Sequence, residues 1–184
     1  ASAASSPADL MAVLRSHGAN AWPRYRPING TLSMPCMHGG GLIASSSSTA
    51  GWVSDLSTDT HWITATSAQC LSLFKPVRVD DPIDIGKIPT DLADHESLWW
   101  RHERLARTVM RDPARLSQLF TPDRDKVEER WLASPPRGQH AFDEHIRLLD
   151  TWSQRVDSQN TGKDVRPWFA RRYWSQRDAG LLEV

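Results

Sequence analysis

The stretch that decides the fold opens with Met34-Pro35-Cys36-Met37-His38-Gly39-Gly40-Gly41 and closes with Leu73-Phe74-Lys75-Pro76. It contains both cysteines and the tightest glycine cluster of the chain. Between these ends lie two segments rich in small, β-branched and aromatic residues, 42–53 and 61–66, separated by a Ser/Thr/Asp break at 57–60. Two such runs joined by a short polar connection predict an antiparallel hairpin, against which the rest of the chain is expected to pack.

Helical signals lie on both sides of this stretch. Ser6 followed by Pro7 predicts a helix start, because a hydroxyl caps the first turn and proline suits the first helical position. Leu10, Val13 and Leu14 form its expected apolar stripe, and Gly18 its expected stop. Beyond Ala93, apolar residues recur at helical spacing in several segments: Leu98, Trp99, His102, Leu105, Ala106, Val109 and Met110; Val127 and Trp131; Phe142, Ile146, Leu149, Trp152 and Val156; Phe169, Tyr173 and Trp174.

These patterns predict an α+β fold in a single domain spanning 1–184. Residues 1–93 are expected to hold a helix and the antiparallel strands, and residues 94–184 a helical half. The charge distribution changes at the same boundary, because only six of the 22 Lys and Arg residues and seven of the 22 Asp and Glu residues lie up to Ala93.

Composition restricts the classes of function. With 39% hydrophobic and 24% charged residues, the chain is expected to bury a real core. Equal numbers of acidic and basic residues and a pI near 7.3 give no support for nucleic-acid or membrane partners. Two cysteines and no apolar run near 18 residues argue against a disulfide scaffold and a membrane span. The start, Ala1-Ser2-Ala3-Ala4, has no signal-peptide pattern, so we expect a cytoplasmic protein. It also lacks an initiator Met, so we expect a fragment of a longer protein or a chain released by processing.

Cys36 and His38 are the first candidates for chemistry. They could form a thiolate beside an imidazole, or they could be a buried cysteine and a histidine bonded to a loop carbonyl. Cys36, His38, His61 and Cys70 could together supply four zinc ligands, but no paired short spacing supports such a site. The sequence therefore predicts no metal and no cofactor.

Three other features have competing readings. The hydroxyls of 45–49 could line a polar substrate pocket or keep an edge strand soluble. His102 lies on an apolar helix stripe, which favours a core histidine over a catalytic one. The basic and aromatic run 166–172 could contact nucleic acid, but acidic neighbours and zero net charge favour a solvated helix face.

Four phrases, taken in order, carry a family resemblance. Pro35-Cys36-Met37-His38-Gly39-Gly40, Ser48-Thr49-Ala50-Gly51-Trp52-Val53-Ser54-Asp55-Leu56, Phe74-Lys75-Pro76 and Leu98-Trp99-Trp100-Arg101-His102-Glu103 resemble the C-terminal portion of the secernin-like cysteine dipeptidase family. The resemblance covers about Leu10 to Tyr173. It implies part of a four-layer αββα sandwich of the N-terminal-nucleophile hydrolase type, in which an N-terminal Cys attacks the amide and its own α-amine serves as base.

The resemblance also implies how the work is divided along the chain. Cys36 is followed by the family's later phrases, so the nucleophile is expected upstream, and no catalytic residue is expected in this chain, which should be inactive alone. His38, Ser48, Thr49 and Cys36 are the implied substrate-binding residues. The implied partners are a small peptide or amide substrate and the upstream segment of the same protein, with a homo-oligomer left open. Acyl transfer or non-peptide amide hydrolysis, and a non-catalytic interaction protein on the same fold, are the alternatives.

Overall fold

The computed structural model describes residues 5–178 and Leu181. Its elements along the chain are α1 (Pro7–Leu14), β1 (Trp52–Asp55), β2 (Thr60–Ile63), β3 (Lys75–Val77), α2 (Leu98–Val109), α3 (Pro113–Leu116), the 3₁₀ turn η1 (Ser117–Leu119), α4 (Thr121–Ala133), α5 (His140–Gln159) and α6 (Trp168–Asp178). This order confirms the α+β class, with strands in the first half of the chain and mostly helices in the second.

The predicted hairpin is present but shorter than the sequence pattern suggests. β1 and β2 pair antiparallel, with Trp52 opposite Ile63 and Asp55 opposite Thr60, and β3 pairs antiparallel with the other edge of β2. Residues 42–51 are β-tolerant but form no strand. Their serine hydroxyls accept backbone N–H groups of residues 34–41, which we call the glycine loop. Ser47 accepts from Gly39 at 2.9 Å and Ser45 from Gly40 at 2.6 Å. This segment therefore bonds to the loop through side chains rather than through a ladder.

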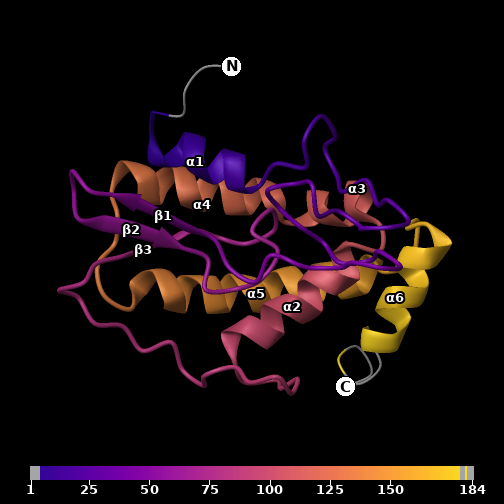
Figure 1. The fold of residues 1–184 in the computed structure, drawn as a ribbon. Coiled ribbons are helices and arrows are strands. Elements are labelled where there is room, and N and C mark those ends of the chain that lie inside the picture. Colours follow the sequence, from indigo (N-terminus) through magenta and orange to yellow (C-terminus); the bar gives the residue numbers. More distant parts are fainter. Residues whose placement is uncertain (1–4, 179–180, 182–184) are drawn as a thin grey trace.

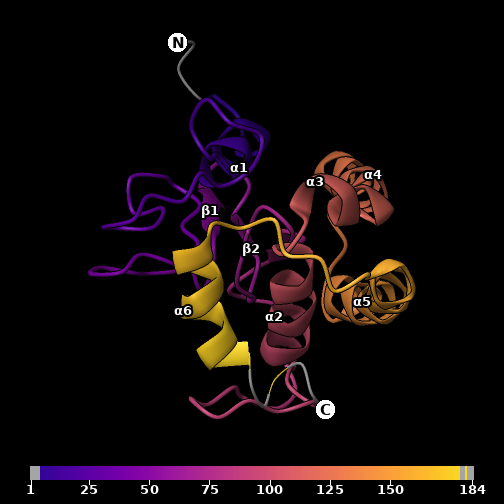
Figure 2. The same ribbon diagram turned by 90° about the vertical axis from the view of Figure 1, so that its right-hand side faces the viewer.

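Helices pack on both sides of the small sheet. Figure 1 shows α1 and α4 above the strands and α2 and α5 below them, and Figure 2 shows α6 beside α2. α1 contacts β1, both α4 and α5 contact β3, and α2 packs along α5. The core between these layers contains the fully buried rings of Trp131, Trp152 and Phe120, the last two with ring centroids 5.1 Å apart.

α1 confirms its predicted start and corrects its predicted face. Ser6 accepts the Asp9 N–H, and Asp9 in turn accepts the Ser6 N–H, which is a reciprocal capping box. The helix stops at Leu14, well before Gly18. Its buried residue is Met11, whereas Leu10 and Val13 of the predicted stripe are 41% and 50% exposed.

The helical half follows its predicted periodicity. In α2 the stripe residues Leu98, His102, Leu105, Ala106 and Val109 are buried, and Ser97 caps the helix by accepting the Trp100 N–H. Pro113 and Pro122 lie in the first turns of α3 and α4, where a proline suits the start of a helix. Among the described helices, none combines the length and apolar character needed to cross a membrane.

Candidate functional site

Four sulfur and nitrogen donors meet behind the glycine loop. Cys36 Sγ lies 3.4 Å and Cys70 Sγ 3.5 Å from His38 Nε2, and His17 Nε2 lies 3.2 Å from the same atom. The four ligand atoms all lie within 4.8 Å of one another. All four residues are buried, with at most 7% of each exposed. We call this group the Cys–His cluster.

Backbone hydrogen bonds bring three separate segments to this point. The Cys36 N–H donates to the Ser16 carbonyl at 3.1 Å, which joins the glycine loop to the residue preceding His17. Thr31 Oγ1 donates to the His38 carbonyl at 2.8 Å and accepts the His38 N–H, so it fixes both sides of that residue. The Cys70 carbonyl accepts a hydrogen bond from Arg124 of α4. The cluster thus rests on irregular segments held by long-range bonds.

The membership of the cluster differs from the sequence-based grouping. His17, after the end of α1, takes the place that the sequence analysis considered for His61. His61 lies in β2, where its Nδ1 is 2.9 Å from Ser54 Oγ and its ring packs against Trp52. Three of the four donors, Cys36, His38 and Cys70, are thus shared with the group of possible zinc ligands seen in the sequence. No short spacing marks His17 as a member, and only its contacts in the fold reveal it.

The two thiols influence each other's protonation. The pKa of Cys36 is lowered, first by the hydrogen bond from Cys70 and further by those from His17 and His38. Burial raises the pKa of Cys70, and the negative charge at Cys36 raises it further. Of the two thiols, Cys36 is thus the one whose surroundings favour the thiolate, whereas those of Cys70 disfavour it.

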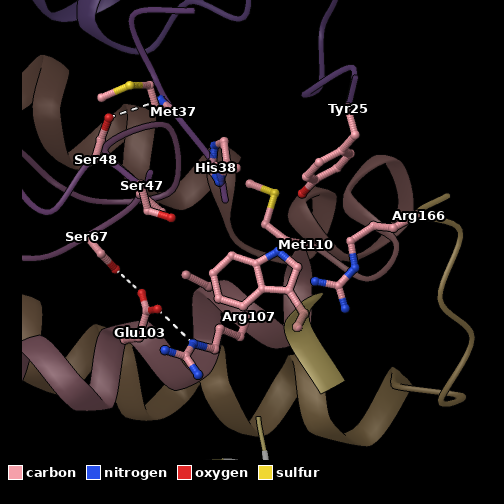
Figure 3. Close-up of a pocket in the computed structure, with 13 residues that line it drawn as sticks. Tyr25, Met37, His38, Ser47, Ser48, Ser67, Glu103, Arg107, Met110 and Arg166 are labelled. Atoms are coloured by element: carbon pink, nitrogen blue, oxygen red, sulfur yellow. Dashed lines mark hydrogen bonds and ion pairs between the residues drawn. The ribbon is translucent and has the colours of Figure 1, made fainter. Parts of the chain in front are cut away.

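A narrow cleft lies next to the cluster, and His38 belongs to both. Figure 3 shows the residues that line the cleft, several of which belong to the glycine loop, to α2 and to the segment entering α6. The centre of a water molecule could occupy about 20 Å³ of this cleft, which suits roughly one water molecule or one terminal group of a ligand. Its lining residues are Tyr25, Met37, His38, Ser47, Ser48, Ser67, Ala68, Glu103, Ala106, Arg107, Met110, Arg166 and Trp174.

Two arginines and a phenol give this cleft its polar character. Arg107 is paired with Glu103, Nε to Oε1 at 2.7 Å, and Arg166 is paired with Asp164, Nη2 to Oδ2 at 2.6 Å. Arg166 Nη1 and Tyr25 Oη are buried, and neither has a hydrogen-bond partner within normal distance among residues 5–178 and Leu181. Burial raises the pKa of Tyr25, so its hydroxyl stays protonated and can donate. The cleft therefore presents two unused donors.

The four implied substrate-binding residues lie in different surroundings. His38 and Ser48 line the cleft. Ser48 Oγ accepts the Met37 N–H at 3.0 Å, so this hydroxyl also shapes the loop. Thr49 is exposed, away from the cleft, and its carbonyl accepts Trp99 Nε1 at 3.0 Å. Cys36 is completely buried in the Cys–His cluster.

Arg166 and Tyr25 are the cleft residues that the sequence analysis did not select. Arg166 lies in the basic and aromatic run that was interpreted as a solvated helix face, yet it is only 5% exposed. Comparisons with protein-family models, curated proteins and solved structures found no match to this chain.

Proposed function

We propose that this chain forms the substrate-binding, C-terminal part of a cysteine-dependent hydrolase that cleaves amide bonds of small peptides. The sheet β1–β2–β3 and the helices on its two sides would form part of a four-layer αββα sandwich in that enzyme. The order of the four sequence phrases supports this assignment. The nucleophile would lie on sequence preceding Ala1, since both cysteines of this chain are buried and directed into the Cys–His cluster.

The unused donors of the cleft are the observation that carries the proposal. Arg166 Nη1 and Tyr25 Oη lack partners in the part of the chain that the structure describes, and a buried donor without an acceptor costs about 1–3 kcal/mol. A carboxylate would satisfy both donors, because charge-assisted bonds from guanidinium to carboxylate are among the strongest that proteins make. The cleft admits only one such group, so it would anchor the free carboxylate of a short peptide whose remainder lies outside.

The proposal assigns different tasks to the residues of the cleft. Arg166 and Tyr25 would hold the substrate carboxylate. His38 and Ser48 would form the wall beside it, with Ser48 keeping the loop in place through the Met37 N–H. Thr49 and Cys36 have no direct part in it, because neither lines the cleft.

The test compares two dipeptide substrates in the intact natural protein, including any sequence that precedes Ala1. One substrate carries a free C-terminal carboxylate and the other the corresponding C-terminal amide. We expect Arg166→Gln to lower kcat/KM for the free acid by roughly ten- to a hundredfold, since a hydrogen bond to a charged group is worth about 1.5–3 kcal/mol. The amide substrate should be affected much less.

Two further variants keep this test decisive. Arg166 also bonds to Asp164, so Tyr25→Phe serves as a variant that removes only an unpaired hydroxyl; it should cost the free acid about two- to tenfold. Arg172→Gln, at an exposed position of α6, is the matched control and should change neither substrate. Equal rates on acid and amide in the wild type, or the same ratio in all variants, would contradict the proposal.

A further inference from the structure

The Cys–His cluster brings together two thiols and two imidazoles, a donor set that suits one kind of ligand. Two thiolates and two imidazole nitrogens in a tetrahedral arrangement are typical of zinc. The four donors come from three segments: His17 after α1, Cys36 and His38 in the glycine loop, and Cys70 in the connection from β2 to β3. No short sequence motif creates this set, so it is a product of the fold.

The three separations that join His38 Nε2 to the other donors match edges of a zinc tetrahedron, and all four donors lie within 4.8 Å of one another. With Zn–N of about 2.0–2.1 Å and Zn–S of about 2.3 Å, tetrahedral angles give about 3.3 Å between two nitrogens and about 3.5 Å between nitrogen and sulfur. The structure has 3.2 Å between the two Nε2 atoms. It has 3.4 and 3.5 Å from His38 Nε2 to the two sulfurs. The donors are thus already spaced for a common ion.

The hydrogen bond behind His17 independently indicates a metal ligand. Its Nδ1 lies 3.1 Å from the Ala21 carbonyl, which can only accept, so Nδ1 carries the proton. In the neutral ring, Nε2 therefore presents a lone pair to the cluster. Histidines that bind metals almost always donate their other ring N–H in this way, because the bond fixes both the tautomer and the ring orientation.

The surrounding backbone holds the donors in place. Besides the bond from Cys36 to Ser16 and the two bonds between Thr31 and His38, Gln69 Nε2 donates to the Leu14 carbonyl at 2.9 Å. Arg15 Nε donates to the Gln69 carbonyl at 2.9 Å, which ties the residue before Cys70 to the end of α1. The supports of all three segments thus interconnect.

From these observations we infer that His17, Cys36, His38 and Cys70 bind one zinc ion in a closed structural site. Four protein ligands complete the coordination, and the burial of all four leaves no open position for water or substrate. Both sulfurs bind as thiolates, so any thiol proton is released to solvent on binding, and the ion crosslinks the end of α1, the glycine loop and the β2–β3 connection. This inference is independent of the proposed hydrolase activity, since its test measures metal and not turnover.

The first measurement is the metal content of the purified 184-residue chain. After dialysis, elemental analysis should find about one zinc per chain. Cys70→Ser and His17→Ala should lose it, whereas His61→Ala, the matched control outside the cluster, should retain it. Cobalt added to chelator-stripped protein should give the intense visible bands of a tetrahedral thiolate complex, and equimolar zinc should abolish them.

The wild-type chain provides a test that needs no substitution. Zinc added to chelator-stripped protein should raise Tm in a saturable, one-to-one manner, whereas magnesium at the same concentration should not. Three results would overturn the site: no stoichiometric zinc in folded protein, a disulfide between Cys36 and Cys70 in place of metal, or zinc content unchanged by Cys70→Ser.

Discussion

At the scale of single residues, the least expected feature is a group of three basic side chains in the core. Lys75, His102 and His145 are all fully buried. Lys75 Nζ donates to the carbonyls of Thr64 and Leu73 and lies 3.0 Å from His145 Nδ1. Burial lowers the pKa of Lys75 to about 7 and that of His102 to about 3. The stability of the fold should therefore depend on the protonation of these side chains.

The sign of that sensitivity follows from His102. In the unfolded chain its pKa is near 6.5, and in the folded chain it is about 3, first because of burial and then because of Lys75. Between these two values the unfolded state binds more protons, so stability is fully present above pH 6.5 and is lost as the pH falls toward 3. The full loss from this one residue is about 5 kcal/mol.

We therefore expect His102→Leu to reduce the acid sensitivity of the fold. The free energy of unfolding, measured with urea at several values between pH 7 and pH 4, should fall less steeply in the variant than in the wild type. His145 contributes with the same sign and should leave a residual slope, since burial lowers its pKa as well. His95→Leu, at an exposed position, is the control. A variant slope identical to that of the wild type would refute this account of His102.

At the scale of elements, a buried ion pair joins α1 to α4. Arg15, at the end of α1, donates from Nη1 to Glu128 Oε2 of α4 at 2.7 Å, and from Nη2 to the Ser72 carbonyl at 2.7 Å. Glu128 also accepts the Phe74 N–H at 2.6 Å. The side chains of Arg15 and Glu128 are only 16% and 7% exposed. Without Arg15, the Glu128 carboxylate would be buried without its cation.

Arg15→Met should therefore destabilise the protein strongly. We expect a loss of about 3–5 kcal/mol in the free energy of unfolding, because removing one partner leaves an uncompensated buried charge. The double variant Arg15→Met/Glu128→Gln should lose less than the sum of the two single variants.

An exposed ion pair provides the matched control for this measurement. Arg130 and Glu144 lie 2.5 Å apart, with side chains 59% and 27% exposed. Arg130→Met should cost less than about 1 kcal/mol. If Arg15→Met and Arg130→Met lose the same free energy of unfolding in urea denaturation, burial does not determine the cost of removing the cation of an ion pair.

At the scale of the whole molecule, the arrangement of the thiols bears on activity. Both cysteines are buried in the Cys–His cluster and form no disulfide, so neither sulfur can reach a peptide bond in solution. We expect the purified 184-residue chain to hydrolyse no dipeptides by itself. The measurement is a dipeptide hydrolysis assay, with Cys36→Ala as a control for background activity. Turnover that disappears with Cys36→Ala but persists with His17→Ala, which also removes a member of the Cys–His cluster, would instead place the nucleophile at Cys36.

Local signals in the sequence determined most of the helices and the hairpin. The Ser6 cap, the prolines at helix starts and the stripe from Leu98 to Val109 work through contacts within a few residues, and all appear in the structure. The β1–β2 hairpin was predictable for the same reason. The buried face of α1 was not, because burial of Met11 rather than of Leu10 and Val13 depends on where the helix packs.

The candidate sites depended on contacts between residues far apart in the sequence. The sequence groups Cys36, His38 and Cys70 with His61 as possible ligands, but the fold brings His17 to them as the fourth donor. The basic and aromatic run around Arg166 predicts an exposed helix face, but the fold buries Arg166 in the same cleft as Tyr25. Periodicity and capping identify regular elements, but these residues lie in irregular segments whose course is set by long-range hydrogen bonds such as that from Cys36 to Ser16. Only the tertiary structure could bring them together.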